Sequence, residues 1–183
     1  DFATYWPADV QVIGKDILRF HAAIWPAMLL GLGLPLPKMV YAHGHVSSGG
    51  QKMSKTLGNV IDPIEVIETH GLDAFRYFLA RHISSYDDGD FSVEKYEDVY
   101  NNELANELGN AVSRVSAMVI KYQSGVIGDI PPAEHDSNSY HESIALCKFD
   151  RALEEVWEQV RGLNQYIEEE KPEIIYTEQQ HIK

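Results

Sequence analysis

The sequence has one cysteine, Cys147, and no stretch of about eighteen consecutive apolar residues of the kind that a membrane helix requires. A lone cysteine permits neither an internal disulfide nor a cysteine-based zinc site, and it indicates no redox chemistry. The first residues, Asp1-Phe2-Ala3-Thr4, lack the basic and apolar regions of a signal peptide. We therefore expect a cytoplasmic protein that does not enter a membrane.

Basic residues are scarce in the second part of the chain. Residues 1–60 hold five Lys or Arg against three Asp or Glu, whereas residues 61–183 hold ten against twenty-five. An acidic surface repels a polyanion at long range, so any nucleic-acid contact in residues 61–183 would need a local patch. The composition therefore argues against a general nucleic-acid-binding protein, while the apolar fraction of 44% is enough to build a core.

An α/β pattern opens the chain. Residues 10–14 read as a short strand that ends at a glycine, and residues 15–30 carry apolar side chains at helical spacing. Pro26 lies within that helix and lacks a backbone donor, so we expect a kink or a break there. Residues 38–46 read as a second strand. A strand, a helix and a strand in this order predict one parallel crossover of an α/β sheet.

Capping signals predict two short helices after residue 60. The segment Asp62-Pro63-Ile64-Glu65 combines an N-cap acid, a proline at the first helical position and a glutamate three residues on, and this helix should stop near Gly71. Asp73 should cap a second helix that runs to residue 81. Residues 84–90 are polar and are expected to form a loop.

Two longer helices are expected in the rest of the chain. Ser92 should cap the first, which ends near residue 125, and residues 128–138 are expected to form a loop before a final helix at about 148–170. Each helix has one apolar side, which should be buried. The apolar residues are Leu104, Leu108, Ala111, Val112, Val115, Val119 and Tyr122 in the first helix, and Phe149, Ala152, Leu153, Val156, Val160, Leu163 and Ile167 in the second. This pattern predicts an all-α antiparallel helical bundle.

Two lysines three residues apart, Lys52 and Lys55, follow a glycine-rich turn at the end of the second predicted strand. A reaction that expels pyrophosphate builds negative charge on the leaving oxygens, and ammonium groups neutralise that charge best where water is excluded. For two isolated lysines, a solvated basic loop is the alternative. The stretch Lys52-Met53-Ser54-Lys55-Thr56, however, resembles the signature loop of the class I aminoacyl-tRNA synthetases, with Thr56 in place of the usual serine. The resemblance implies that these five residues bind ATP and that Lys52 and Lys55 are catalytic.

Further segments resemble the methionyl-tRNA synthetase family in particular. They are residues 12–21, 24–29, 88–92, 102–110 and 113–114, so the resemblance covers nearly the whole chain up to Pro172. It implies an enzyme that activates methionine with ATP and Mg²⁺ and passes the methionyl group to tRNA(Met).

The resemblance also implies a division of the chain. Residues 1–60 would be the C-terminal part of a Rossmann-type catalytic domain, residues 61–90 a connecting region, and residues 91–183 a helical anticodon-binding domain. The family's first nucleotide-binding half, with its His-Ile-Gly-His type motif, and its zinc-binding insert are expected outside this chain. We therefore expect no metal site in the chain and no activity from it alone.

Residues after the first predicted strand match the amino-acid pocket of the family. Positions matching Ile17, Phe20, His21 and Trp25 line the methionine pocket there, and the position matching Asp16 lies near the bound ribose or adenylate. Taken from the residues alone, Ile17, Phe20 and His21 share one helical face that would serve equally well as core. An apolar, aromatic pocket with one polar tip does, however, suit an unbranched thioether.

Polar residues at two further places are candidate contacts. His43-Gly44-His45 ends the second predicted strand, where ligands of α/β sheets usually bind, and we expect His43 and Gly44 to approach ATP. No third ligand lies at zinc spacing from these histidines. Asn110 and Arg114 should project from one side of a helix and can read unpaired anticodon bases, as the matching positions of the family do. A solvated face is the alternative interpretation of that pair.

Two other functions stay open from the sequence. One is a free-standing tRNA-binding or regulatory protein derived from a synthetase, although such a protein has no use for the lysine pair. The other is a class I synthetase for valine or isoleucine. The chain also departs from the family at Glu173, where a tryptophan that stacks on an anticodon base usually follows the proline, and we expect weaker anticodon binding as a result.

Overall fold

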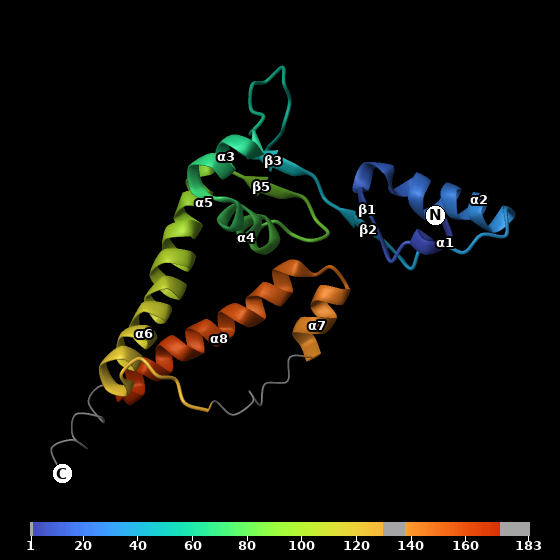
Figure 1. The fold of residues 1–183 in the computed structure, drawn as a ribbon. Coiled ribbons are helices and arrows are strands. Elements are labelled where there is room, and N and C mark those ends of the chain that lie inside the picture. Colours follow the sequence, from blue (N-terminus) through green and yellow to red (C-terminus); the bar gives the residue numbers. More distant parts are fainter. Residues whose placement is uncertain (1, 130–137, 173–183) are drawn as a thin grey trace, which may run out of the picture.

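The computed structural model describes residues 2–129 and 138–172 of the chain (Figure 1). Its N-terminal part holds a parallel pair of strands with helical segments between them. These elements are α1 (Phe2–Tyr5), β1 (Val10–Gly14), the short 3₁₀ helix η1 (Lys15–Ile17), the π-helical turn η2 (Phe20–Ile24), α2 (Trp25–Gly31) and β2 (Met39–His43). Val10 pairs with Met39 and Gly14 with His43, so the predicted parallel crossover is confirmed.

The helix around Pro26 is continuous but changes type. The backbone at Arg19, Ile24 and Trp25 stays in the right-handed helical region, so the chain is not broken there. A π-type turn precedes α2, and Pro26 is the second residue of α2. Proline has no backbone N–H, so Pro26 donates no hydrogen bond to the π-type turn before it.

The second predicted strand is divided between two sheets. β2 ends at His43, and after Gly44 and His45 the chain enters β3 (Val46–Ser48) of a separate three-stranded sheet. In that sheet β3 lies between β4 (Gln51–Lys52), which is antiparallel to it, and β5 (Gly89–Phe91), which is parallel. The expectation of a loop over residues 84–90 is therefore wrong at its end, where Gly89 and Asp90 pair with Val46 and Ser47.

The two short helices after residue 60 are present. Helix α3 (Pro63–His70) begins as predicted, with the Asp62 carboxylate accepting a 2.8 Å hydrogen bond from the Ile64 amide. Helix α4 (Leu72–His82) begins two residues earlier than expected, with Gly71 as its N-cap. The predicted cap Asp73 instead lies in the first turn, where a negative charge is favourable beside the helix dipole.

The rest of the described chain is helical. The Ser92 hydroxyl accepts a hydrogen bond from the Lys95 amide, which confirms the predicted cap. From there the chain runs through α5 (Val93–Val99), the π-helical η3 (Tyr100–Gly109) and α6 (Asn110–Gln123). After the linker come α7 (Asn138–Ala145), which was not predicted, and α8 (Phe149–Glu170). Most of the loop expected at residues 128–138 lies outside the described residues.

The directions of these helices differ from the expected antiparallel bundle. In the contacts between α8 and the continuous helix η3–α6, the residue numbers increase in both helices in the same direction. The two helices therefore run parallel, and they converge at their C-terminal ends (Figure 1). The contacting pairs are Glu103 with Trp157, Glu107 with Asn164, and Arg114 with Glu168. Against α4, in contrast, α8 is antiparallel, with Tyr77 beside Trp157 and Arg81 beside Glu154. The antiparallel prediction is therefore wrong for α6 and α8, which are joined by residues 124–148 and not by a short turn.

Only some of the apolar residues that were predicted to be buried in the two long helices are buried. Ala111, Ala152 and Ile167 are buried, but Val112 is 58% exposed and Leu163 is 42% exposed. A separate aromatic core joins α3, α4, β5 and α5 through Val66, Phe78, Phe91 and Tyr96.

Ser85 joins the N-terminal strands to the helices. Its backbone carbonyl accepts a 2.7 Å hydrogen bond from the Tyr41 hydroxyl of β2. Its own hydroxyl donates to Asp150 at 2.9 Å and accepts from the Phe149 amide, the first residue of α8, at 3.0 Å. Ser85 is buried and thus fixes the start of α8 against the end of α4.

Glu103 is the polar centre where α4, η3 and α8 meet. One oxygen of its carboxylate accepts hydrogen bonds from the Tyr77 hydroxyl, from Arg81 Nε at 3.1 Å and from Trp157 Nε1 at 3.0 Å. His82 Nε2 lies 3.0 Å from the same oxygen. Burial alone would raise the pKa of Glu103, but the hydrogen bonds from Tyr77, Trp157 and His82 together outweigh it and hold the pKa at about 2.

Because the folded-state pKa of Glu103 lies below its ordinary 4.5, its ionised form stabilises the fold above that pH. We predict that Glu103→Gln lowers the free energy of unfolding at neutral pH by about 3 kcal/mol, the cost of leaving buried charged partners uncompensated. The difference between parent and variant should shrink as the pH falls from 4.5 to about 2. Urea titrations across this range measure it. Glu154→Gln is the control, because the half-exposed Glu154 should contribute less than about 1 kcal/mol.

Candidate functional site

A hollow beside α2 gathers most of the predicted methionine contacts. Its volume is about 360 Å³. Its lining residues are Gln11, Phe20, His21, Ile24, Trp25 and Met28. Phe20, His21 and Trp25 therefore come together as the sequence suggested. Ile17 does not line the hollow, and its side chain is 38% exposed.

The π-type turn η2 helps to arrange the lining of this hollow. The Trp25 amide donates to the Phe20 carbonyl five residues earlier, and turns of this kind are frequent at functional sites. His21 Nδ1 lies 3.1 Å from the Ile17 carbonyl oxygen, and its ring meets Trp25 edge to face at 5.8 Å. Trp6 packs against the other side of Trp25 at 5.6 Å. Ile17 thus acts on the hollow through its backbone, by orienting His21.

Sequence reasoning missed three lining residues, Gln11, Ile24 and Met28. The signal for Ile24 and Met28 was present, because they follow Phe20 at successive four-residue steps of the helix. Gln11 comes from β1, and nothing in the sequence indicates which side of this strand faces the helix.

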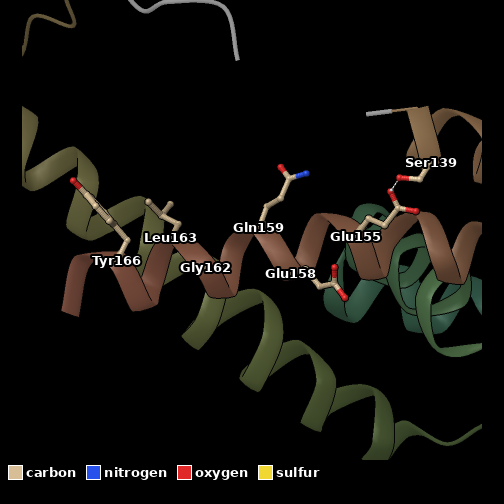
Figure 2. Close-up of a pocket in the computed structure, with 7 residues that line it drawn as sticks. All are labelled: Ser139, Glu155, Glu158, Gln159, Gly162, Leu163 and Tyr166. Carbon is tan, nitrogen blue, oxygen red and sulfur yellow. Dashed lines mark hydrogen bonds between the residues drawn. The ribbon is translucent and has the colours of Figure 1, made fainter. Parts of the chain in front are cut away.

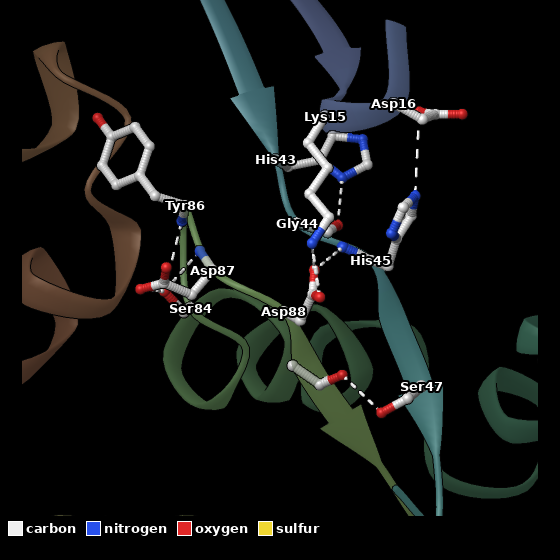
Figure 3. Close-up of polar contacts among 11 residues, drawn as sticks. Lys15, Asp16, His43, Gly44, His45, Ser47, Ser84, Tyr86, Asp87 and Asp88 are labelled. Carbon is white, nitrogen blue, oxygen red and sulfur yellow. Dashed lines mark hydrogen bonds and ion pairs between the residues drawn. The ribbon is translucent and has the colours of Figure 1, made fainter. Parts of the chain in front are cut away.

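The candidate ATP contacts cluster at the carboxyl ends of β1 and β2 (Figure 3). Asp16 follows β1, and its carboxylate lies 4.0 Å from His45 Nε2. His43 ends β2, and its Nδ1 lies 2.9 Å from the Gly44 carbonyl oxygen. The register that pairs Gly14 with His43 brings these groups to one edge of the parallel sheet, where ligands of α/β folds bind.

Gly44 is required by the protein backbone itself. A Cβ atom on Gly44 would lie 2.0 Å from the carbonyl oxygen of Asp87, a distance at which the two segments could not both keep their positions. The glycine therefore has a structural reason, the close approach of the 84–90 segment, that is independent of any nucleotide. The expected approach of ATP to Gly44 stays a proposal, restricted to the side that Asp87 does not cover.

The lysine loop extends from the three-stranded sheet. Gly49 and Gly50 make the turn between β3 and β4 with φ of 61° and 73°, values that favour glycine. Lys52 lies in β4 and Lys55 in the turn beyond it, both with exposed side chains. The Asn59 side chain closes the loop, accepting from the Ser54 amide at 2.8 Å and donating to the Lys52 carbonyl at 3.3 Å.

The lysine loop does not touch the hollow beside α2. Figure 1 shows residues 49–60 projecting from β3 and α3, away from α2. Met53 and Ser54 are half-buried within the loop, and Thr56 is exposed. The sequence grouped this loop with Asp16, His43 and Gly44 as ATP contacts, whereas in the structure the loop projects away from the part of the chain that holds Asp16.

Asn110 and Arg114 line one hollow of about 320 Å³, at the seam between η3–α6 and α8. The remaining lining residues are Asn102, Asn106, Glu107, Asn164 and Glu168. Arg114 Nη1 lies 3.8 Å from a Glu168 oxygen, and Asn164 donates to the Glu107 carbonyl at 3.4 Å. Sequence reasoning missed Asn102 and Asn106, although they precede Asn110 at four-residue steps. Glu173 lies outside the described residues.

A larger hollow, of about 660 Å³, lies along α8 (Figure 2). Its lining residues are Ser139, Glu155, Glu158, Gln159, Gly162, Leu163 and Tyr166. The Ser139 hydroxyl donates to Glu155 at 2.7 Å, which ties α7 to α8. None of the predicted site residues lies in this hollow.

The described ranges, 2–129 and 138–172, contain neither a candidate metal cluster nor a candidate membrane span. Among these residues, no group of three or more His, Cys, Asp and Glu side chains could hold a metal ion. None of the helices in the same ranges is long and apolar enough to cross a membrane.

Comparison with known proteins places this geometry in a family. Residues 1–116 match the family model described as tRNA synthetases class I (M). The methionine–tRNA ligase of Caldanaerobacter subterraneus subsp. tengcongensis is 44% identical over 185 residues, covering 95% of this chain and 29% of the relative. That of Thermotoga maritima is 42% identical over 189 residues, covering 97% of this chain and 30% of the relative.

A solved structure agrees with these matches. The crystal structure of Mycobacterium tuberculosis methionyl-tRNA synthetase bound by methionyl-adenylate superposes with a TM-score of 0.84 at 36% identity. The match covers 96% of this chain and 36% of that one. The fold and the family model define the class, that of the class I tRNA synthetases. Within it, the chain belongs to the methionyl-tRNA synthetase family, and it spans about 29% of the length of the relatives it matches.

The approach of Asp87 to Gly44 gives a test of the site's geometry. We predict that Gly44→Ala lowers the free energy of unfolding by about 2 kcal/mol, because the added methyl group forces the 84–90 segment away. Gly31→Ala is the matched control, since no atom lies within 4 Å of its Cβ position at the end of α2. Urea unfolding should show the control at or slightly above the parent. Equal midpoints for all three proteins would contradict the close approach.

Proposed function

We propose that this chain acts in a methionine–tRNA ligase, where it supplies the lysine loop, part of the methionine pocket and the anticodon-facing helices. The observation that carries the proposal is the hollow where Phe20, His21 and Trp25 converge, in a chain that belongs to this family. In the reaction, the methionine carboxylate attacks the α-phosphate of ATP, which forms methionyl-adenylate and releases pyrophosphate. A hydroxyl of the terminal ribose of tRNA(Met) then attacks the adenylate carbonyl, and AMP leaves.

The hollow beside α2 suits a methionine side chain. Phe20, Ile24 and Trp25 offer apolar and aromatic surface, and a polarizable thioether sulfur makes favourable contacts with aromatic rings. His21 adds one polar edge, held in place by the Ile17 carbonyl and the Trp25 ring. Valine and isoleucine are branched and lack the sulfur, so this lining favours methionine over them.

Lys52 and Lys55 are proposed to bind the phosphates of ATP, which enters with Mg²⁺ as the substrate complex. Because their loop projects away from the α2 hollow, the reaction requires the loop to close toward the carboxyl ends of β1 and β2. In the closed state the two ammonium groups would neutralise charge on the departing pyrophosphate. Asp16 and His43, which already stand at those strand ends, are proposed to contact the adenosine.

The hollow at the seam of η3–α6 and α8 is proposed to bind the anticodon. Asn110 and its asparagine neighbours each present a donor and an acceptor, which suits the edges of unpaired bases, and Arg114 adds a planar cation. On this proposal the chain divides as expected into a catalytic part (1–60), a connecting region (61–90) and an anticodon-binding helical part (91–183). The cytoplasm is the proposed compartment, in keeping with a lone Cys147 that is buried and unpaired.

Methionine-dependent exchange between ATP and pyrophosphate by the full-length protein tests the proposal. We predict exchange with methionine but not with valine or isoleucine. Lys55→Ala should slow adenylate formation about a hundredfold or more while methionine affinity changes little, because the lysine acts on charge that develops in the transition state. The 183-residue chain by itself should give no exchange. Unaltered activation by Lys55→Ala, with a change only in methionine affinity, would show the assigned role to be wrong.

The anticodon hollow predicts a binding phenotype for Arg114. Arg114→Ala should weaken binding of a stem-loop with the anticodon CAU about tenfold, and it should reduce the preference over a scrambled loop. Titrations of both loops must share one salt concentration, because phosphate contacts make affinity salt-dependent. Arg151→Ala is the control, since Arg151 is exposed on α8 and does not line the hollow. If Arg114→Ala binds both loops as the parent does, the anticodon assignment fails.

A further inference from the structure

Strand β5 is a short strand that is fixed at one end and polar at the other. Phe91, its last residue, is 2% exposed and packs edge to face on Phe75 and Phe78 in the aromatic core. At the other end of the strand, the Gly89 amide donates to the His45 carbonyl at 2.9 Å. The carboxylates just before and within β5, Asp88 and Asp90, are therefore carried on a rigid support.

Asp90 holds the turn from which the lysine loop starts. One oxygen of its carboxylate accepts from the Ser47 hydroxyl at 2.6 Å and from the Gly50 amide at 2.8 Å. Gly50 is the second of the two consecutive glycines with positive φ between β3 and β4. Two residues later the chain reaches Lys52. A single carboxylate thus joins the core-anchored strand β5 to the one turn that links the lysine loop to β3.

Asp88 makes the corresponding connection to the strand ends of the parallel sheet (Figure 3). Its carboxylate pairs with Lys15 Nζ, at 2.5 Å from Oδ1, and accepts from the His45 amide at 2.7 Å. Lys15 directly follows β1, and His45 lies between β2 and β3. The 84–90 segment therefore contacts the candidate adenosine site through Asp88 and the base of the lysine loop through Asp90.

We propose that Asp90 is a positioning residue for amino-acid activation, which sets the direction in which the lysine loop leaves the sheet. The inference rests on the proposed function, because it gives the loop a purpose only if Lys52 and Lys55 act on ATP. Two consecutive glycines allow the turn many conformations, and the carboxylate selects one by holding the Gly50 amide. Without that bond the lysines would reach the phosphates from a broader range of positions, and positioning errors of about 1 Å can cost a hundredfold in rate.

The test uses the full-length protein and compares Asp90→Ala with Asp87→Ala. Both variants remove a carboxylate from the 84–90 segment, but the Asp87 carboxylate accepts from the Ser84 hydroxyl at 3.4 Å, whereas that of Asp90 accepts from the Gly50 amide. We expect Asp90→Ala to slow single-turnover formation of methionyl-adenylate about tenfold or more. Methionine affinity should stay within about twofold of the parent, because the α2 hollow lies on other elements. Asp87→Ala should activate methionine as the parent does.

Hydrogen exchange supplies a readout that does not depend on activity. The Gly50 amide should exchange faster in Asp90→Ala than in the parent or in Asp87→Ala, while amides of the Phe78 and Tyr96 core stay protected. Ser47→Ala removes the second partner of Asp90, together with the 3.1 Å bond from the same hydroxyl to the Gly89 carbonyl, and should slow activation in the same direction by about threefold.

The outcomes separate the inference from the function on which it rests. Absence of methionine-dependent exchange in the parent would overturn the proposed function. Exchange in the parent, together with parent-like activation and Gly50 protection in Asp90→Ala, would overturn the role of Asp90 alone. Equal losses of activation and methionine affinity in Asp90→Ala and Ser47→Ala would also overturn it, because they indicate a general disturbance of the fold.

Discussion

The carboxylate of Glu103 is the contact on which the relative positions of the helices depend. It is the shared acceptor for side chains from α4 and α8 while itself belonging to η3, so three elements that are distant in sequence meet at one oxygen. Arg81 extends the arrangement by pairing with Glu154 and by lying over the Trp157 ring at 5.5 Å. Since the hollow that Asn110 and Arg114 line opens between η3–α6 and α8, its shape follows from the geometry that Glu103 imposes beside it.

Much of the local structure could be predicted from the sequence, and the long-range arrangement could not. The strand at 10–14, the caps at Asp62 and Ser92, and the extent of α8 all follow from patterns within a few residues. The direction of α8 relative to α6 depends on the path of the long connection between them, which no local pattern records. The three residues of β5 are too few to show an alternating pattern, so the strand that supports Asp88 and Asp90 was taken as loop.

In the candidate sites, too, the local features could be predicted from the sequence and the long-range contacts could not. His21 and Trp25 were assigned from resemblance and lie together, whereas Ile17, assigned from the same resemblance, does not line the hollow. Trp157 was not among the residues expected to be buried in the final helix, yet it is 4% exposed and its indole donates to Glu103. Asn102 and Asn106 were not singled out from the sequence, although they precede Asn110 at four-residue steps. Their convergence with Asn164 exists only because α8 runs parallel beside them.

Because the start of α8 is fixed at Ser85, the length of this helix determines how far its C-terminal end lies from the parallel sheet. A helix of 22 residues is about 33 Å long, and its first amide is bonded to the residue that also binds β2. The separation between the parallel sheet and the hollow lined by Asn110 and Arg114 is therefore set by the number of residues in α8. Each residue also turns the helix by about 100°, so a single insertion between Trp157 and Asn164 would rotate Asn164 and Glu168 out of the hollow. Length changes in this family should accordingly be tolerated in the linker before α7 and excluded from the body of α8.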